Sequence, residues 1–220
     1  LNLYRECRSL IGRHSAPVMN VLRDEAHDEL LRMGFPTRQD EEYKYTDVEA
    51  IFAPDYGINL GRLDIPVNPY DVFKCDVPNM STSLYFIVND RFYMKALPKV
   101  ALPEGVLLGS LKEIAEQYPD FVSKYYGQLA DTRSDAITAL NTALAHDALL
   151  IHVPKNQRVE DPIVIDNWLR GTAATMMNRR VLIILEQGAE ATVIINDHAA
   201  DKQRYLTTQV MEVHCSDSSH

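Results

Sequence analysis

The chain has 220 residues, which suits one large or two small domains and is long enough to bury a sizeable core. With 46% hydrophobic and 24% charged residues, its composition is ordinary for a globular protein. The formal net charge of −9 argues against nucleic acid or an acidic membrane surface as a main partner, because each of these requires a basic face.

Residues 1–53 are predicted to form an N-terminal helical region. A short helix is expected over residues 3–11. Ser15 is predicted to cap the next helix, whose first turn holds Pro17 and therefore loses no hydrogen bond. Gly34 then provides the C-terminal stop, since glycine adopts the left-handed conformation at low cost. One apolar stripe defines this helix and consists of Val18, Val21, Leu22, Ala26, Leu30 and Met33. A brief amphipathic helix from Thr46 is expected to end before Pro54.

Residues 54–147 are predicted to form a mixed connector. Its first part, residues 55–83, is rich in Pro, Gly and Asn and is expected to be loop with at most short strands. Asn89-Asp90 between two apolar runs predicts a β-hairpin. Ser110 and Glu113 have capping-box spacing, which predicts a helix that runs to about residue 118. Two further helices are expected over residues 121–126 and 135–144.

Residues 148–220 are predicted to be β-structure. Apolar, β-branched runs predict five strands, over residues 149–153, 163–165, 181–185, 191–195 and 206–214. The runs on either side of Gly188 do not alternate apolar and polar residues, so we expect both faces of each strand to be covered. No helix of crossover length separates the strands, which disfavours a doubly wound sheet. The pattern favours a β-solenoid, with a sandwich as the structural competitor.

The two ends of the chain suggest a fragment. The sequence does not begin with Met, and residues 210–215 are strand-like without any capping element after them. We therefore expect that missing residues or another subunit complete the β-structure. No apolar run reaches the roughly 20 residues of a membrane span, and the start lacks the layout of a signal peptide. The cysteines Cys7, Cys75 and Cys215 are few and widely spaced, which predicts reduced thiols and a cytoplasmic location.

The sequence carries no nucleotide-binding motif, because neither a Walker A sequence nor a Gly-x-Gly-x-x-Gly sequence occurs. Metal ligation is predicted to be absent. His214 and Cys215 are adjacent in a strand and so point to opposite faces. His152 and His198 could approach each other in a coiled stack, although a hydrogen-bonded or surface histidine is the more general expectation.

Paired carboxylates would support a β-helix carbohydrate-active enzyme, which remains an alternative. The candidates are Asp40-Glu41-Glu42, Glu160-Asp161, and Glu186 with Glu190. Four tyrosines could contribute to an interaction surface. For Tyr125 and Tyr126 we favour packing against helices, whereas Tyr43 and Tyr45 are left open.

Two stretches resemble the SufD proteins of the SUF iron–sulfur cluster assembly system, in the SufB/SufD family. Residues 34–46 read Gly-Phe-Pro-Thr-Arg-Gln-Asp-Glu-Glu-Tyr-Lys-Tyr-Thr and are similar to the family signature, with Tyr43 where the family often has Trp. Residues 180–197 are similar to a family segment that continues Glu-x-Gly-Ala-Glu-Ala-Thr-Val-Ile after an apolar run. The resemblance covers nearly the whole chain.

The resemblance implies an N-terminal helical region followed by a right-handed parallel β-helix core, here truncated. It also implies a non-catalytic scaffold that pairs with a SufB-like paralogue and supports a SufC-like ATPase, with a homodimer as the open alternative in isolation. Iron–sulfur clusters would be built transiently in the whole complex, where some assemblies use a reduced flavin. The family's cluster-associated histidine and SufC-docking helices match no position here. We therefore assign no catalytic residue and no metal ligand, and we leave cofactor-binding residues open. A plain binding module without any cluster link is the third hypothesis.

Overall fold

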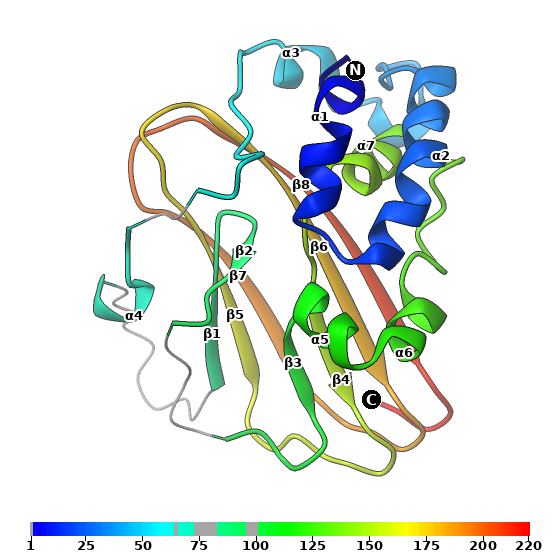
Figure 1. Ribbon diagram of the computed structural model, residues 1–220, viewed down its shortest axis with the longest axis vertical. Helices are drawn as coiled ribbons and strands as arrows, with labels where there is room; N and C mark the ends of the chain where they lie inside the picture. The colour runs from blue at the N-terminus through cyan, green and yellow to red at the C-terminus, as the bar shows by residue number, and fades with distance from the viewer. Residues whose placement is uncertain (1, 64–65, 73–82, 96–100) are drawn as a thin grey trace.

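The computed structural model describes residues 2–63, 66–72, 83–95 and 101–220 (Figure 1). Within them the strands form two four-stranded sheets. The first has the order β2–β1–β5–β7 and consists of β1 (Ser83–Val88), β2 (Arg91–Phe92), β5 (Ile163–Leu169) and β7 (Val193–Ala199). The second has the order β3–β4–β6–β8 and consists of β3 (Leu107–Ser110), β4 (Leu149–Val153), β6 (Thr175–Leu185) and β8 (Tyr205–Cys215).

The expected parallel β-helix is wrong. Each sheet is mixed: β1 pairs with β2 and β3 pairs with β4 in antiparallel orientation, whereas the other neighbouring strands are parallel. No closed solenoid forms among the described residues, and the architecture is α/β with two separate sheets. The physical reason is that apolar periodicity identifies a strand but does not specify which neighbour its backbone pairs with. From β4 to β8, successive strands alternate between the two sheets.

The two sheets pack against each other through an apolar core. Ile163 and Ile165 of the first sheet meet Ile151, Val181 and Ile183 of the second in one buried cluster. Burial of this many aliphatic side chains is the dominant favourable term for such a fold. The opposite face of the second sheet is covered by helices, as Figure 1 shows. The order of layers is therefore sheet, sheet, helices.

The N-terminal helices largely follow the prediction. They are α1 (Asn2–Arg13), α2 (Pro17–Met33) and α3 (Val48–Phe52), with a short 3₁₀ helix at Glu41–Tyr43. Gly34 ends α2 with φ of 72°, and its N–H donates to the Leu30 carbonyl at 2.9 Å. The predicted cap is wrong, because Ala16 occupies the N-cap position. The Ser15 hydroxyl donates instead to the Ile11 carbonyl, at the end of α1.

The central helices are α4 (Pro69–Val72), α5 (Leu111–Gln117), α6 (Pro119–Tyr125) and α7 (Ala136–Leu144). The predicted start of this helix at Ser110 is confirmed, since Ser110 Oγ accepts from the Glu113 N–H. The predicted hairpin forms between β1 and β2, with φ of 60° at Asn89. Strand β3 was not predicted, and it pairs with β4. None of the helices in the described part of the chain is long and apolar enough to cross a bilayer.

Four of the five predicted strands are longer than expected, and only β4 has the predicted length. Strand β6 begins at Thr175 rather than at residue 181, and almost all of its side chains are buried, which confirms coverage of both faces. Strand β7 contradicts the same expectation, because Val193–Ala199 is only half-buried at first and exposed at its end. The reason is its position at the edge of the first sheet. The turn at Gly188 is confirmed, with φ of 68°.

Candidate functional site

Two of the histidines considered from the sequence lie in one row across the second sheet. His152 of β4 is in register with Ile184 of β6, which is in register with His214 of β8. Two strand spacings separate the backbones of the two histidines by roughly 10 Å. Each ring nitrogen Nε2 contacts a different group, so we do not assign the row as a metal site.

Each histidine of the row is engaged with its surroundings. His152 Nε2 lies 3.0 Å from Glu186 Oε1, and its ring packs on Phe121 with centroids 4.7 Å apart. His214 Nε2 lies 3.1 Å from the Tyr125 carbonyl oxygen, which requires a protonated Nε2. These contacts attach α6 and the turn after β6 to the second sheet. Their role is structural.

The remaining candidate ligands are dispersed. His198 belongs to β7 of the first sheet, whereas His152 belongs to β4 of the second, so the two histidines are not neighbours in one stack, which the sequence had left possible. His198 Nε2 instead lies 3.2 Å from Asp166 Oδ1. Cys215 is exposed, Cys7 is half-buried against the helical core, and Cys75 lies outside the described residues. In the described part of the chain, no group of three or more His, Cys, Asp or Glu residues could hold a metal ion.

The acidic candidates near the β-strands are bound to histidine, arginine or backbone partners. Glu186 Oε2 accepts from the Lys155 N–H at 3.0 Å in addition to its contact with His152. Glu190 and Glu160 both lie beside Arg158, at 3.5 Å and 3.3 Å. These acids therefore hold turns in place and do not face each other across a groove.

The remaining acidic candidates are Asp161 and the three acids of residues 34–46, and those that have partners contact residues close by in the sequence. Asp40 accepts from the Thr37 N–H at 2.7 Å, and Glu41 pairs with Lys44 three residues later. Glu42 is exposed, and Asp161 is half-buried in the turn before β5. None of these four acids is placed as a catalytic pair.

The tyrosines differ in how they are engaged: Tyr43 and Tyr126 contact other parts of the fold, whereas Tyr45 faces solvent. The Tyr43 hydroxyl donates to Asp135 Oδ2. Burial raises the pKa of Tyr43, and this hydrogen bond raises it further. Tyr45 is 90% exposed. Tyr126 is buried as expected, and its ring lies 4.9 Å from the Arg180 guanidinium carbon. Its hydroxyl has no hydrogen-bond partner among the described residues.

A buried ionic network that was not predicted from the sequence joins the helices to the second sheet. Arg180 Nη2 and Glu212 Oε2 are 2.9 Å apart. Glu212 also accepts from the N–H groups of Gly127 and Leu129, which follow α6. Burial by itself would raise the pKa of Glu212, but Arg180 and these N–H donors hold it below its usual range.

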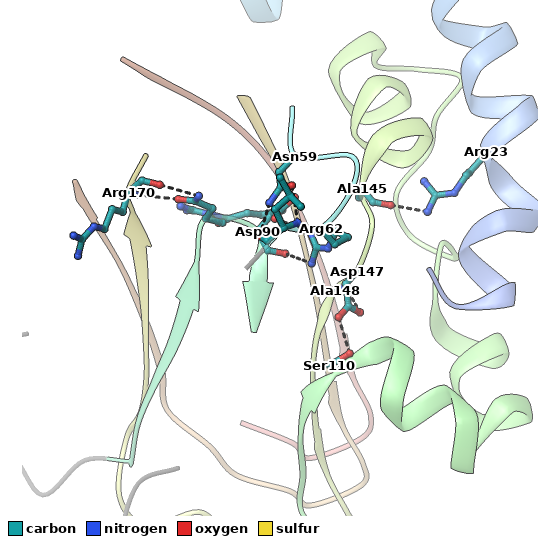
Figure 2. Close-up of polar contacts among 12 residues, drawn as sticks. Arg23, Asn59, Arg62, Asp90, Ser110, Ala145, Asp147, Ala148 and Arg170 are labelled. Carbon is teal, nitrogen blue, oxygen red and sulfur yellow. Dashed lines mark hydrogen bonds and ion pairs between the residues drawn. The ribbon is translucent and has the colours of Figure 1, made fainter. Parts of the chain in front are cut away.

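Arg23 of α2 makes the second buried connection. Its guanidinium donates to the Ala143 carbonyl at 2.8 Å, at the C-terminal end of α7. It also donates to the Ala145 carbonyl at 2.6 Å, as Figure 2 shows. It also donates to Ser15 Oγ at 2.6 Å. A cation at this place satisfies carbonyls that the helix leaves unpaired and interacts favourably with the helix dipole. An arginine between apolar positions of a predicted helix is the sequence signal that could have revealed it.

A further group of polar side chains lies around β3 and the hairpin. Figure 2 shows Arg62 beside Asp90, with 2.6 Å between Nη1 and Oδ1, and Asp147 beside Ser110. Asp147 accepts from Ser110 Oγ at 2.6 Å, and its burial raises its pKa. A cavity of about 10 Å³ between these residues and Arg179 has the volume of about one water molecule. A substrate does not fit there.

Comparisons with known proteins identify a family to which this chain is similar. The family model that describes the N-terminal region of SufBD proteins matches residues 1–165. An iron–sulfur cluster assembly SufBD family protein of Synechocystis is 24% identical over 228 residues, which is 100% of this chain and 49% of that protein. The SufD of Escherichia coli is 25% identical over 195 residues, 87% of this chain and 42% of that protein.

A third relative is the SufD of Bacillus subtilis, which is 27% identical over 124 residues, 55% of this chain and 28% of that protein. The chain thus spans about half the length, or less, of these curated relatives. Residues 34–46, which resemble the family signature, lie within the range that the family model matches. Residues 180–197 lie beyond it and are covered by the alignment to the Synechocystis protein. Because the family model covers most of its residues, this chain belongs to the SufBD family.

Proposed function

We propose that this protein is a non-catalytic scaffold component of an iron–sulfur cluster assembly complex of the SUF type. In it the protein pairs with a SufB-like paralogue and supports a SufC-like ATPase. The observation that carries the proposal is the match of residues 1–165 to the SufBD N-terminal region. The names of the relatives support it, because those from Synechocystis, Escherichia coli and Bacillus subtilis are all described as iron–sulfur cluster assembly proteins.

The use of charged groups in the fold supports a scaffold role. The buried pairs Arg180–Glu212 and Arg62–Asp90 link elements of the fold, and the candidate acids Glu186 and Glu190 have separate partners. An enzyme would instead bring titratable groups together in a cleft.

Partner association is supported by the outer strands of the two sheets. Strands β7 and β8 lie at the sheet edges, where backbone groups can pair with another strand. Met211 and Val213 of β8 are each about 40% exposed, although their neighbours on β6 are buried in the core between the sheets. An apolar edge of this kind favours association with a further polypeptide.

Iron–sulfur clusters are the cargo in this proposal, held transiently by the whole complex, and no residue of this chain is assigned as their ligand. A flavin does not fit the two cavities described for this chain, which measure about 10 and about 150 Å³. Pockets for ligands of flavin size start at roughly 300 Å³. No step of the reaction is therefore assigned to a flavin on this chain. We also propose a cytoplasmic location, for which the few, widely spaced cysteines are the support.

Co-purification tests the proposal directly. The tagged protein is co-expressed with the SufB-like and SufC-like proteins of its own organism, and the complex is isolated by affinity and size-exclusion chromatography. We expect a stable complex whose ATPase activity exceeds that of the SufC-like protein alone. In cells, loss of this protein should lower the activity of iron–sulfur enzymes. A protein that stays alone and whose loss leaves those enzymes unaffected would contradict the proposal and favour a plain binding module.

The carbohydrate-active alternative has its own test. A glycan cleavage screen is run on the wild type and on Glu186→Ala and Glu190→Ala, with Glu104→Ala as a matched exposed control. We expect no cleavage by any of the four proteins. Cleavage that disappears only in the Glu186 and Glu190 variants would replace the scaffold proposal by the enzyme.

A further inference from the structure

An apolar pocket of about 150 Å³ lies in the helical layer and is lined by residues of α1, α2, α3, α7 and β6. Its floor is made by buried side chains such as Leu30 of α2 and Ala143 of α7. Tyr4 and Phe52 contribute aromatic walls. The lining is almost wholly apolar, so the pocket favours an apolar occupant over a polar one.

The pocket opens to solvent through an apolar rim. Leu3 and Phe35 line it and are 37% and 38% exposed. Leu31 and Ile51, next in sequence to the lining residues Leu30 and Phe52, are 40% exposed. Exposed apolar side chains that gather around a cavity mark an interaction site far more often than such side chains scattered singly.

The volume limits what can enter. An apolar cavity of about 150 Å³ accommodates a molecule of the size of benzene. One leucine or phenylalanine side chain therefore fits the pocket, whereas a cofactor or a lipid chain exceeds it. The size is that of an anchor residue at a protein interface.

The charged residues at the rim of the pocket indicate which residues flank the anchor on the partner. Glu6 follows Leu3 by three residues on α1, and Glu49 precedes Phe52 by three residues, so helical spacing places each acid on the side of a lining residue. Both acids are exposed and make no ion pair within the described part of the chain. The basic Arg38 and Lys44 nearby are already paired, with Asp47 and Glu41. The rim is therefore acidic in balance.

We propose that this pocket is a docking site for a basic segment of a partner protein, which inserts one leucine or phenylalanine side chain between lysines or arginines. The apolar lining provides the affinity for the anchor. The acidic rim attracts the flanking cations and sets the preference for a basic partner. The proposed scaffold function does not use this surface, so this inference can fail while that function stands.

The test uses a fluorescent peptide of about 15 residues that consists of lysine and alanine with one central phenylalanine. Its binding to the purified protein is measured by fluorescence anisotropy at low salt. A peptide with alanine in place of phenylalanine is the control for the anchor. We expect it to bind at least about tenfold more weakly, as the loss of a buried aromatic anchor predicts. Equal binding of the two peptides would overturn the proposal.

Variants of the protein locate the site. Ala143→Leu fills the pocket, so it should weaken peptide binding by about tenfold while the unfolding temperature is kept or raised. If this variant is instead destabilised, Leu3→Ala at the exposed rim tests the same contact. A folded, filled variant that binds the peptide like the wild type would contradict the assignment.

Charge variants test the rim. Glu6→Lys with Glu49→Lys should weaken peptide binding several-fold at low salt. Glu104→Lys with Glu116→Lys changes the net charge equally, at exposed positions that do not line the pocket, and should have a smaller effect. If the two double variants weaken peptide binding equally, the peptide is attracted only by the net charge of the protein, and the proposal is overturned. Toluene is added as a second probe. If toluene binds the protein but the peptide does not bind and is not displaced by it, the pocket is a site for a small apolar molecule. That result would also overturn the docking proposal.

Discussion

Arg180 on β6 and Glu212 on β8 form an ion pair of 2.9 Å whose side chains are each only 1% exposed. The pair connects two parallel neighbouring strands and, through the N–H groups of Gly127 and Leu129, also holds the segment after α6. Arg180 Nη1 donates in addition to Thr142 Oγ1 of α7 at 2.6 Å. A single buried pair thus fixes the helical layer to the second sheet.

Loss of one partner of this pair should destabilise the fold strongly. Glu212→Gln keeps an oxygen that accepts from the N–H groups but leaves Arg180 as an uncompensated buried charge, so we expect a loss of about 3 kcal/mol. Arg180→Met should cost a similar amount. The double variant should lose less than the sum of the two, with a coupling of about 2 kcal/mol. Urea unfolding of the four proteins measures this cycle, and additive losses would show that the two residues act independently.

The same carboxylate should make the protein sensitive to acid. The pKa of Glu212 is lower in the folded than in the unfolded chain, so its contribution is complete above the ordinary glutamate value and is lost as the pH falls through the folded value. Between about pH 5 and pH 3 the wild type should therefore lose more stability than Glu212→Gln. Urea midpoints at both pH values provide the comparison. An equal loss in the two proteins would assign the acid sensitivity to other groups.

His146 should contribute a separate pH dependence. Its ring is buried between α7 and β4, both of its nitrogens lack a hydrogen-bond partner in the described chain, and burial lowers its pKa to about 4. The unfolded chain therefore binds this proton more readily, so stability falls as the pH drops below the ordinary histidine value. From about pH 7 to pH 5 this amounts to about 2 kcal/mol.

The variant His146→Leu should remove that part of the pH dependence. Its free energy of unfolding is measured by urea titration at about pH 7 and pH 5 and compared with that of the wild type. His220→Gln, which removes an exposed histidine, is the matched control. If the difference between the two pH values is the same in all three proteins, His146 is not the group responsible.

Arg23 should not be replaceable by lysine. Its planar guanidinium donates in several directions at once, to carbonyls at the end of α7 and to Ser15 Oγ, and a lysine ammonium cannot reproduce this arrangement. We expect Arg23→Lys to lower the free energy of unfolding by about 2 kcal/mol. Arg5→Lys, at an exposed position of α1, should change it by less than about 0.5 kcal/mol. Similar values for the two variants would mean that the guanidinium geometry is unimportant.

The turn at Gly188 should require glycine. Its φ is positive, and an added Cβ would lie 2.6 Å from Asn156 Oδ1. Gly188→Ala should therefore cost about 2 kcal/mol. Combination with Asn156→Gly should recover the part due to the contact. Gly61→Ala, where the nearest atom would be 4.0 Å away, should cost less than about 1 kcal/mol. Thermal unfolding of the variants measures these differences, and equal losses for Gly188→Ala and Gly61→Ala would contradict the requirement.

The features that could be predicted from the sequence are local. The stop of α2 at Gly34, the cap of α5 at Ser110 and the limits of β4 depend on residues within one or two turns of each other. The predicted cap at Ser15 was wrong because Ala16 occupies the N-cap position, and the Ser15 hydroxyl instead accepts from Arg23, eight residues later. Strand β3 was missed because its residues Leu107–Ser110 are too few to show a period.

The candidate site shows the same division. The sequence correctly separated His214 from Cys215, since neighbouring residues of a strand point to opposite faces. It could not bring His152 to Glu186, or Arg180 to Glu212, because each pair is more than 30 residues apart along the chain. The buried arginines stand beside apolar runs in the sequence and resemble ordinary exposed charges there.

By itself, the sequence determined most of the helices, most of the strands and the turn at Gly188, because these depend on backbone preferences and apolar periodicity within short windows. It missed α4, which lies in residues predicted to be loop. It also carried the two stretches that resemble the SufBD family. Only the tertiary structure decided that β6 and β7 belong to different mixed sheets and that a buried ion pair joins the second sheet to the helices. The physical reason is that a strand can satisfy its hydrogen bonds with many partners, so its neighbour is chosen by the packing of the whole chain.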